Sequence, residues 1–261
     1  MKKFFSIGLV RGLVWQVIGT AAGMGLLGAI RALMGLPWKT EPAMVFGGVV
    51  GAITFLAGIG TLRDWWHMAL GKPVPEAEEV HETPGGARYW GVSLDHKVIG
   101  VQYGFLSMIT LALGGTFALI FRTELAQAGL DFLNYLQFNT LIGMHGMVLI
   151  ASILMGIAAM ANFIIPLMIG AKDMAFPRLN AFSFWLLFFG GLVMYSSYLF
   201  DSVPNGGWTA YPPLTGPQYT PGPNIDFWIL GLHLVGLSSL FGAINFIVTV
   251  LNLRAPGMKL L

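Results

Sequence analysis

An uncharged stretch of 40 residues constrains this chain more than any other feature. From Phe132 to Ala171 the sequence contains no Lys, Arg, Asp or Glu. A helix needs about 20 mostly apolar residues to cross a bilayer, so this stretch is long enough to span a membrane. It also contains an imidazole, His145. An intramembrane histidine is costly and indicates a functional site: a haem or metal ligand, a proton relay, or a polar link between helices.

The composition indicates a membrane protein. Hydrophobic residues make up 56% of the chain and charged residues 10%, whereas a soluble domain carries about 25% charged residues. The net charge of +2 is small, so binding of nucleic acid is not expected, and the absence of Cys excludes Fe–S clusters and thiolate ligands. We expect an all-α polytopic bundle with six transmembrane helices, near residues 12–34, 43–62, 98–121, 139–167, 179–200 and 227–253.

The distribution of Lys and Arg predicts the orientation of these spans. With the N-terminus inside, the inner segments contain eleven of these residues and the outer segments three. Because cytoplasmic loops carry the excess of positive charge, both termini are expected in the cytoplasm. The first span is interpreted as a retained helix, since a second span follows at once and a cleavage site followed by soluble sequence is missing.

Three regions follow from the pattern of spans. Residues 1–62 form a glycine-rich transmembrane hairpin, expected to serve as a scaffold or assembly contact. Residues 63–97 form a polar cytoplasmic linker, expected to be mostly irregular. Residues 98–261 hold four spans and an outer loop, Asp201–Asp226, which is expected to fold onto the protein. Three histidines of the linker are expected to be solvated or interfacial: His67, His81 and His96.

Glycines flank the histidine of the uncharged stretch. Gly143 and Gly146 remove side-chain bulk near His145, and a planar ring such as a porphyrin would need that space. Helix position alone favours the alternative, a histidine bonded to a neighbouring helix. His233, in the outer part of the last span, is interpreted as a structural hydrogen-bonding residue rather than a haem ligand.

Other polar residues lie at the ends of the spans. Asp173 could collect protons at a pathway mouth, although alone it would be interpreted as a solvated acid of the loop. Arg122 could donate to a cofactor, but an interfacial pair with Glu124 is favoured by position. Amides and hydroxyls that bracket Asp173 in the sequence or lie within the last span could hold a file of water molecules or link helices: Asn162, Asn180, Asn245, Ser238 and Ser239.

Five motifs in order carry a family resemblance. They are HKVIG at 96–100, GMHG at 143–146, PLMIGAKDMAFPRLN at 166–180, GWTAYPPL at 207–214 and GAINFIVT at 242–249. Residues from about 95 to 261 resemble the first four helices of subunit I of the haem-copper oxidases, specifically the A-type cytochrome c oxidases. The first two spans and most of the linker lie outside the resemblance.

The resemblance implies cofactor contacts at three positions. His145 matches an axial ligand of the low-spin haem a, Arg122 matches the arginine that bonds the formyl group of that haem, and Trp208 matches a tryptophan near its propionates. Glu124 matches an acid that holds sodium or calcium in some members of the family.

The resemblance also implies a proton path. Asp173 matches the entry of the D channel, and five residues match its lining: Asn162, Asn180, Asn245, Ser238 and Ser239. The implied function is the N-terminal portion of the catalytic subunit of a terminal respiratory oxidase, which couples oxygen reduction to proton pumping in aerobic respiration. The implied location is the plasma membrane of a prokaryote.

In the family this subunit has twelve core helices, and the second haem a ligand, the copper ligands and the haem a3 ligand follow the fourth. We therefore expect this polypeptide not to reduce oxygen alone, either because the subunit is split or because it is truncated. Expected partners are the remainder of subunit I, subunits II and III, and cytochrome c through subunit II. Alternatives are a quinol oxidase of the same family and a membrane scaffold without haem. The pattern around Asp173 disfavours a nitric oxide reductase, and His145 alone gives little support for a transporter.

Overall fold

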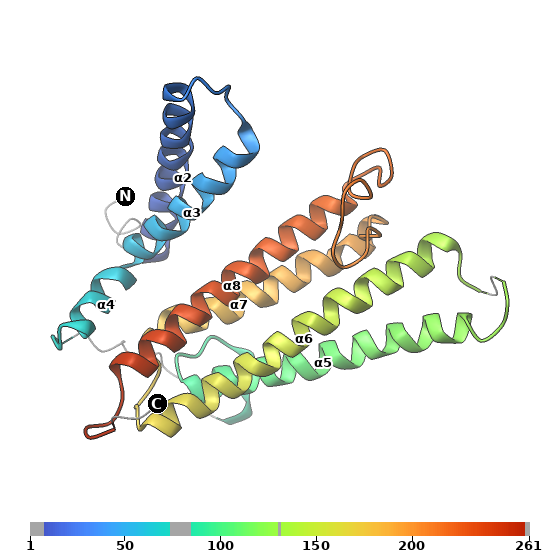
Figure 1. Cartoon of the computed structure of the whole chain (residues 1–261). Coiled ribbons are helices and arrows are strands. Elements are labelled where there is room, and N and C mark those ends of the chain that lie inside the picture. Colours follow the sequence, from blue (N-terminus) through green and yellow to red (C-terminus); the bar gives the residue numbers. More distant parts are fainter. Residues whose placement is uncertain (1–7, 74–84, 130–131, 259–261) are drawn as a thin grey trace. The chain divides into compact units, whose positions relative to one another are not determined.

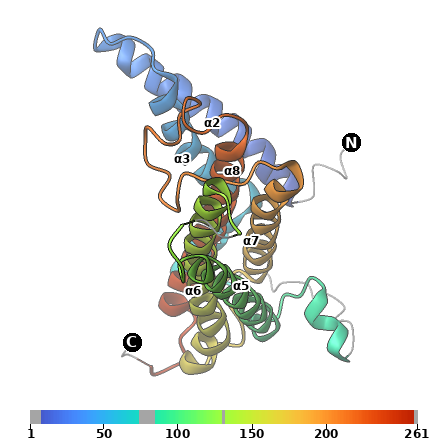
Figure 2. The same ribbon diagram turned by 90° about the vertical axis from the view of Figure 1, so that its right-hand side faces the viewer.

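The computed structural model describes residues 8–73, 85–129 and 132–258. The chain divides into two compact units, Met1–Glu76 and Ala77–Leu261. Regular structure in the described residues is entirely helical (Figures 1 and 2). Within these described ranges, six helices are long and apolar enough to cross a membrane, which confirms the predicted number of spans and the all-α class.

The first unit is a helical hairpin followed by a short helix. Helices α2 (Gly8–Leu33) and α3 (Thr40–Ile59) pack together closely because glycines lie where they meet. A Cβ atom at Gly23 would lie 2.9 Å from the Cα atom of Gly47. The glycine-rich pairing expected from the sequence is therefore confirmed.

Part of the linker is more regular than expected. Gly60 adopts a left-handed conformation with φ of 94°, and α4 (Thr61–Ala69) begins directly after it. Asp64 in the first turn and His67 in the last turn match the helix dipole, and they help to explain why this polar segment is helical. A 3-10 helix, η1 (Gly85–Trp90), follows, whereas residues 74–84, including His81, lie outside the described part of the chain.

The second unit contains two long hairpins that lie side by side (Figure 1). The first pairs α5 with α6, and the second pairs α7 with α8. A short 3-10 helix, η2, continues α7. Their bounds are α5 (His96–Glu124), α6 (Tyr135–Ile169), α7 (Pro177–Ser196), η2 (Ser197–Phe200) and α8 (Asn224–Asn252).

Local signals in the sequence explain where these helices begin and end. The Asp95 side chain accepts the backbone N–H of Lys97 at 2.7 Å and caps α5. Asn134 and Gln137 form a capping box, and for this reason α6 begins four residues before the predicted start of its span. Gly170, with φ of 70°, ends α6 in a left-handed conformation.

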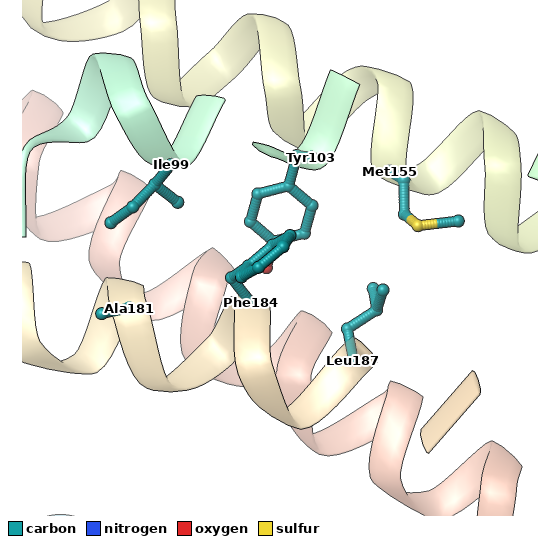
Figure 3. Close-up of a cluster of buried hydrophobic side chains, with 6 residues drawn as sticks. All are labelled: Ile99, Tyr103, Met155, Ala181, Phe184 and Leu187. Carbon is teal, nitrogen blue, oxygen red and sulfur yellow. The ribbon is translucent and has the colours of Figure 1, made fainter. Parts of the chain in front are cut away.

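A buried apolar cluster joins α5, α6 and α7 (Figure 3). The rings of Tyr103 and Phe184 meet edge to face, with centroids 5.1 Å apart. Outside this cluster, large apolar side chains such as Met108, Leu119 and Met160 are exposed, as in a protein surrounded by lipid or by other apolar helices. The cluster comprises Ile99, Tyr103, Met155, Ala181, Phe184 and Leu187.

Candidate functional site

His145 is bonded to the neighbouring helix through one ring nitrogen. Its Nδ1 lies 2.8 Å from the carbonyl oxygen of Gly114 on α5. A carbonyl can only accept, so Nδ1 is the donor, and in the neutral ring Nε2 keeps its lone pair. The Phe121 ring packs edge-on against the imidazole, with centroids 5.4 Å apart. His145 can therefore link the two helices and also serve as a ligand, since the two roles use different ring nitrogens.

The glycines beside His145 lie where the outer loop approaches α6 closely. A Cβ atom at Gly146 would lie 3.0 Å from the Cβ atom of Trp208, and one at Gly143 would lie 3.5 Å from the Cα atom of Gly207. Both glycines therefore let the outer loop approach α6 closely, and the space for a porphyrin beside His145 stays a prediction. The expected folding of the loop onto the protein is confirmed, and it brings Trp208 against Gly146, the residue after His145.

Arg122 and Glu124 differ strongly in their surroundings. Arg122 is exposed in the last turn of α5, directly after the residue that packs on His145. Glu124 is only 1% exposed, and its Oε2 accepts the backbone N–H groups of Phe132 at 3.1 Å and Leu133 at 3.0 Å. The Glu124 carboxylate thus fastens the connection between α5 and α6. The described residues contain no group of three or more His, Cys, Asp or Glu side chains that could hold a metal ion.

Asp173 is half-buried in the connection between α6 and α7. Its Oδ1 accepts the backbone N–H of Met174 at 2.6 Å. Burial raises the pKa of this carboxyl above its ordinary value, and nearby Asp95 adds to the rise. The backbone N–H groups of Met174 and His96, together with the His96 ring, act in the opposite direction. Asp173 therefore holds a proton more readily than a solvated aspartate.

Asn245 and Thr249 on α8 hold the chain that follows Asp173. Asn245 accepts the backbone N–H of Phe176 through Oδ1 at 2.9 Å and donates to its carbonyl through Nδ2 at 3.3 Å. Thr249 accepts the backbone N–H of Ala175 at 2.9 Å. Both side chains are fully buried. This clamp orients the start of α7, where the next polar residue lies.

Asn162 and Asn180 are buried amides with unmet hydrogen-bonding capacity. Asn162 donates from Nδ2 to the Ala158 carbonyl at 2.8 Å, but its Oδ1 has no partner among the described residues. Neither the oxygen nor the nitrogen of the Asn180 amide has a partner there. Unpaired buried polar atoms are costly, and ordered water is their usual remedy. These three atoms are therefore suitable places for bound water.

A chain of hydrogen bonds continues from Asn180 between the helices. Ser183 donates to the Asn180 carbonyl at 2.8 Å, and its hydroxyl lies 3.1 Å from the hydroxyl of Tyr103. Ser238 donates to the Ser183 carbonyl at 2.6 Å. Ser239 is exposed and does not take part in this cluster. The structure thus joins Asn180 to Ser238 through Ser183, with Tyr103 bonded to the same serine. The sequence analysis selected neither Ser183 nor Tyr103.

The expectation of a solvated or interfacial His96 is wrong. The residue is only 2% exposed, and its Nδ1 lies 2.7 Å from the backbone carbonyl of Asn162. Tyr103 lies seven residues further along α5, on the same helical face, so helical spacing could have revealed both. By contrast, His233 bonds to the Ile229 carbonyl of its own helix at 2.7 Å, which confirms the structural role expected for it.

Comparison with known proteins gives a consistent result for the second unit. A family model described as cytochrome C and quinol oxidase polypeptide I matches residues 98–261. The putative cytochrome c oxidase subunit 1-beta of Streptomyces coelicolor is 43% identical over 216 residues, covering 77% of this chain and 36% of that protein. Cytochrome c oxidase subunit 1 of Synechocystis is 47% identical over 173 residues, covering 66% of this chain and 31% of that protein. The corresponding subunit of Corynebacterium glutamicum is 41% identical over 203 residues, covering 74% of this chain and 33% of that protein. The chain spans about a third of the length of these relatives.

Proposed function

Because the chain belongs to the cytochrome c and quinol oxidase subunit I family, we propose that it forms the N-terminal portion of the catalytic subunit of a terminal respiratory oxidase. In this role the multi-pass chain binds a low-spin haem a and forms the entry of the proton path for oxygen reduction. The observation that carries the proposal is the bond from His145 to Gly114, which orients the imidazole through Nδ1 and leaves Nε2 out of this bond.

The residues around His145 fit a haem. A neutral imidazole is a common axial ligand, and a haem with both axial positions filled transfers electrons rather than binding oxygen. Trp208 lies beside the ligand helix, where it would border the propionates, and Arg122 would donate to the formyl group. The second axial ligand, the copper ligands and the haem a3 ligand would come from the remainder of subunit I.

The polar residues between α5 and α8 fit a proton path. Asp173 would take protons from the cytoplasm, because burial keeps its affinity for protons high. The unpaired amide atoms of Asn162 and Asn180 would hold water, and the hydroxyls of Ser183 and Tyr103 would continue the file. Glu124 would serve mainly to fasten the loop. Its carboxylate would additionally coordinate a sodium or calcium ion.

The proposed setting is the plasma membrane of a prokaryote, with both termini in the cytoplasm, as the Lys and Arg distribution indicates. Residues 1–62 would form an accessory hairpin, 63–97 a linker and 98–261 the first four core helices. Subunits II and III would complete the complex. The relatives carry the name cytochrome c oxidase, which favours cytochrome c over quinol as the electron donor.

The test is the absorbance spectrum of the complete oxidase that contains this chain, with His145→Ala. The low-spin haem bands are expected to disappear. The matched control is His233→Ala, which removes another intramembrane histidine whose printed bond lies within its own helix and is expected to keep the bands. Unchanged low-spin bands in His145→Ala would overturn the proposal. Absence of haem from the unaltered complex would favour a scaffold.

A further inference from the structure

His96 lies where three segments of the second unit meet. It is the first residue of α5, and its Nδ1 donates to the carbonyl oxygen of Asn162 on α6 at 2.7 Å. The backbone N–H of the same residue donates to Asp173, in the connection between α6 and α7. One buried residue therefore contacts two of the residues proposed for the proton path, Asp173 and Asn162.

The carbonyl that His96 binds is left free by a proline. In an α-helix the carbonyl of residue 162 would accept the N–H of residue 166, four positions later. Residue 166 is a proline inside α6 and has no N–H to give. A buried carbonyl without a partner is costly, and the His96 ring supplies the missing donor.

The bond from His96 holds the turn of α6 that carries the buried Asn162 side chain. The Asn162 side chain is 1% exposed, and its Oδ1 has no partner among the described residues. The donor to its carbonyl comes from α5, so the ring ties the turn of α6 that carries the amide to the start of α5. Without that donor, the turn around Pro166 would relax and the amide would move relative to Asp173.

We propose that His96 is a positioning residue of the proton entry: its ring replaces the donor missing at Pro166 and thereby holds Asn162 in register with Asp173. This inference rests on the proposed function. It assigns no proton transfer to the ring. The positioning role requires only that an N–H donor occupy the position of Nδ1.

The test compares His96→Asn with His96→Leu in the complete oxidase, purified and reconstituted in vesicles. The two side chains have nearly the same shape, and only asparagine carries an N–H donor near the place of Nδ1. Proton uptake from the inner side and electron transfer from the donor to haem are measured separately. His96→Leu is expected to slow proton uptake about tenfold, and His96→Asn to stay within about twofold of the unaltered protein. Electron transfer to haem and the haem spectrum are expected to stay unchanged in both.

A second pair of variants keeps the inference testable where His96→Leu assembles poorly. Pro166→Ala returns an N–H group to the Asn162 carbonyl, so adding His96→Leu to it is expected to cost less than twofold in proton uptake. If the double variant is as slow or as poorly assembled as His96→Leu alone, the ring has a packing role and the inference fails.

Asp173→Asn separates this inference from the proposed function. Slow proton uptake in Asp173→Asn together with normal uptake in His96→Leu would overturn the positioning role alone. Normal uptake in Asp173→Asn would overturn the proposed proton entry itself.

Discussion

Ser107 on α5 and Ser152 on α6 each donate a hydroxyl to the backbone carbonyl of the other, both at 2.8 Å. The two bonds form a reciprocal link in the middle of the α5–α6 hairpin, where Gly114 and the His145 helix also meet. Hydrogen bonds between membrane helices contribute only modestly, on average about 0.6 kcal/mol. The link therefore sets the register of the two helices rather than supplying much of the stability.

Removing this link should have a small effect on stability. Ser107→Ala and Ser152→Ala are each expected to cost about 0.6 kcal/mol, and the double variant less than the sum of the two, because the two bonds are coupled. Denaturation of the complex in mild detergent measures the effect. A loss of assembly in either single variant would show that the link does more than set the register.

The two asparagines near Asp173 should behave differently when replaced by leucine. Asn245→Leu removes two bonds to the backbone of Phe176, and it should destabilise the protein by about 2–3 kcal/mol. Asn180→Leu removes an amide without partners among the described residues, so it should leave stability nearly unchanged while slowing proton uptake. Thermal unfolding and proton uptake are measured for both. Equal destabilisation by the two variants would contradict the prediction.

The close approach of Trp208 to α6 should make Gly146 intolerant of a side chain. A Cβ atom there would lie 3.0–3.2 Å from three atoms of Trp208, so Gly146→Ala should push the outer loop away at a cost of about 1–3 kcal/mol. The matched control is Gly115→Ala on α5, where an added Cβ meets nothing within 4 Å. Limited proteolysis of the loop and the haem absorbance measure the change. Equal cleavage in the two variants would argue against the contact.

Burial of Asp173 predicts a defined pH dependence of stability. The pKa of this carboxyl is raised above its ordinary value of 3.8, so folding favours the protonated form. Its stabilising contribution is complete below about pH 3.8 and is lost as the pH rises through the raised pKa.

Asp173→Asn should remove this dependence. The stability of the unaltered protein relative to the variant should therefore fall with rising pH across this window and stay level above it. Thermal unfolding of both proteins over the acidic range measures the difference. A difference that grows in the opposite direction would show that the backbone N–H groups outweigh burial.

The sequence predicted the helices better than the contacts between them. Six uncharged or nearly uncharged segments were sufficient to locate the spans, because a bilayer imposes length and polarity on each helix separately. The bond from His96 to Asn162 was not predictable in the same way, because it depends on how α5 and α6 are aligned.

The outer loop was likewise predicted as an element, but its contacts were not. The composition of Asp201–Asp226 correctly predicted a loop that folds onto the protein. It did not predict that Trp208 would approach Gly146, since the glycines were assigned to a porphyrin alone. Small residues show that something approaches closely, but they do not identify it.

The residues that surround His145 and its neighbour Gly146 come from segments that the ribosome makes at different times. Gly114 precedes the histidine, whereas Trp208 follows it and reaches α6 only after α7 has crossed the membrane. A nascent chain that ends between α6 and the outer loop thus holds its imidazole by contacts with α5 alone. The surroundings of the histidine are completed during the synthesis of the following hairpin. The order of translation is therefore also the order in which the segments around the histidine assemble.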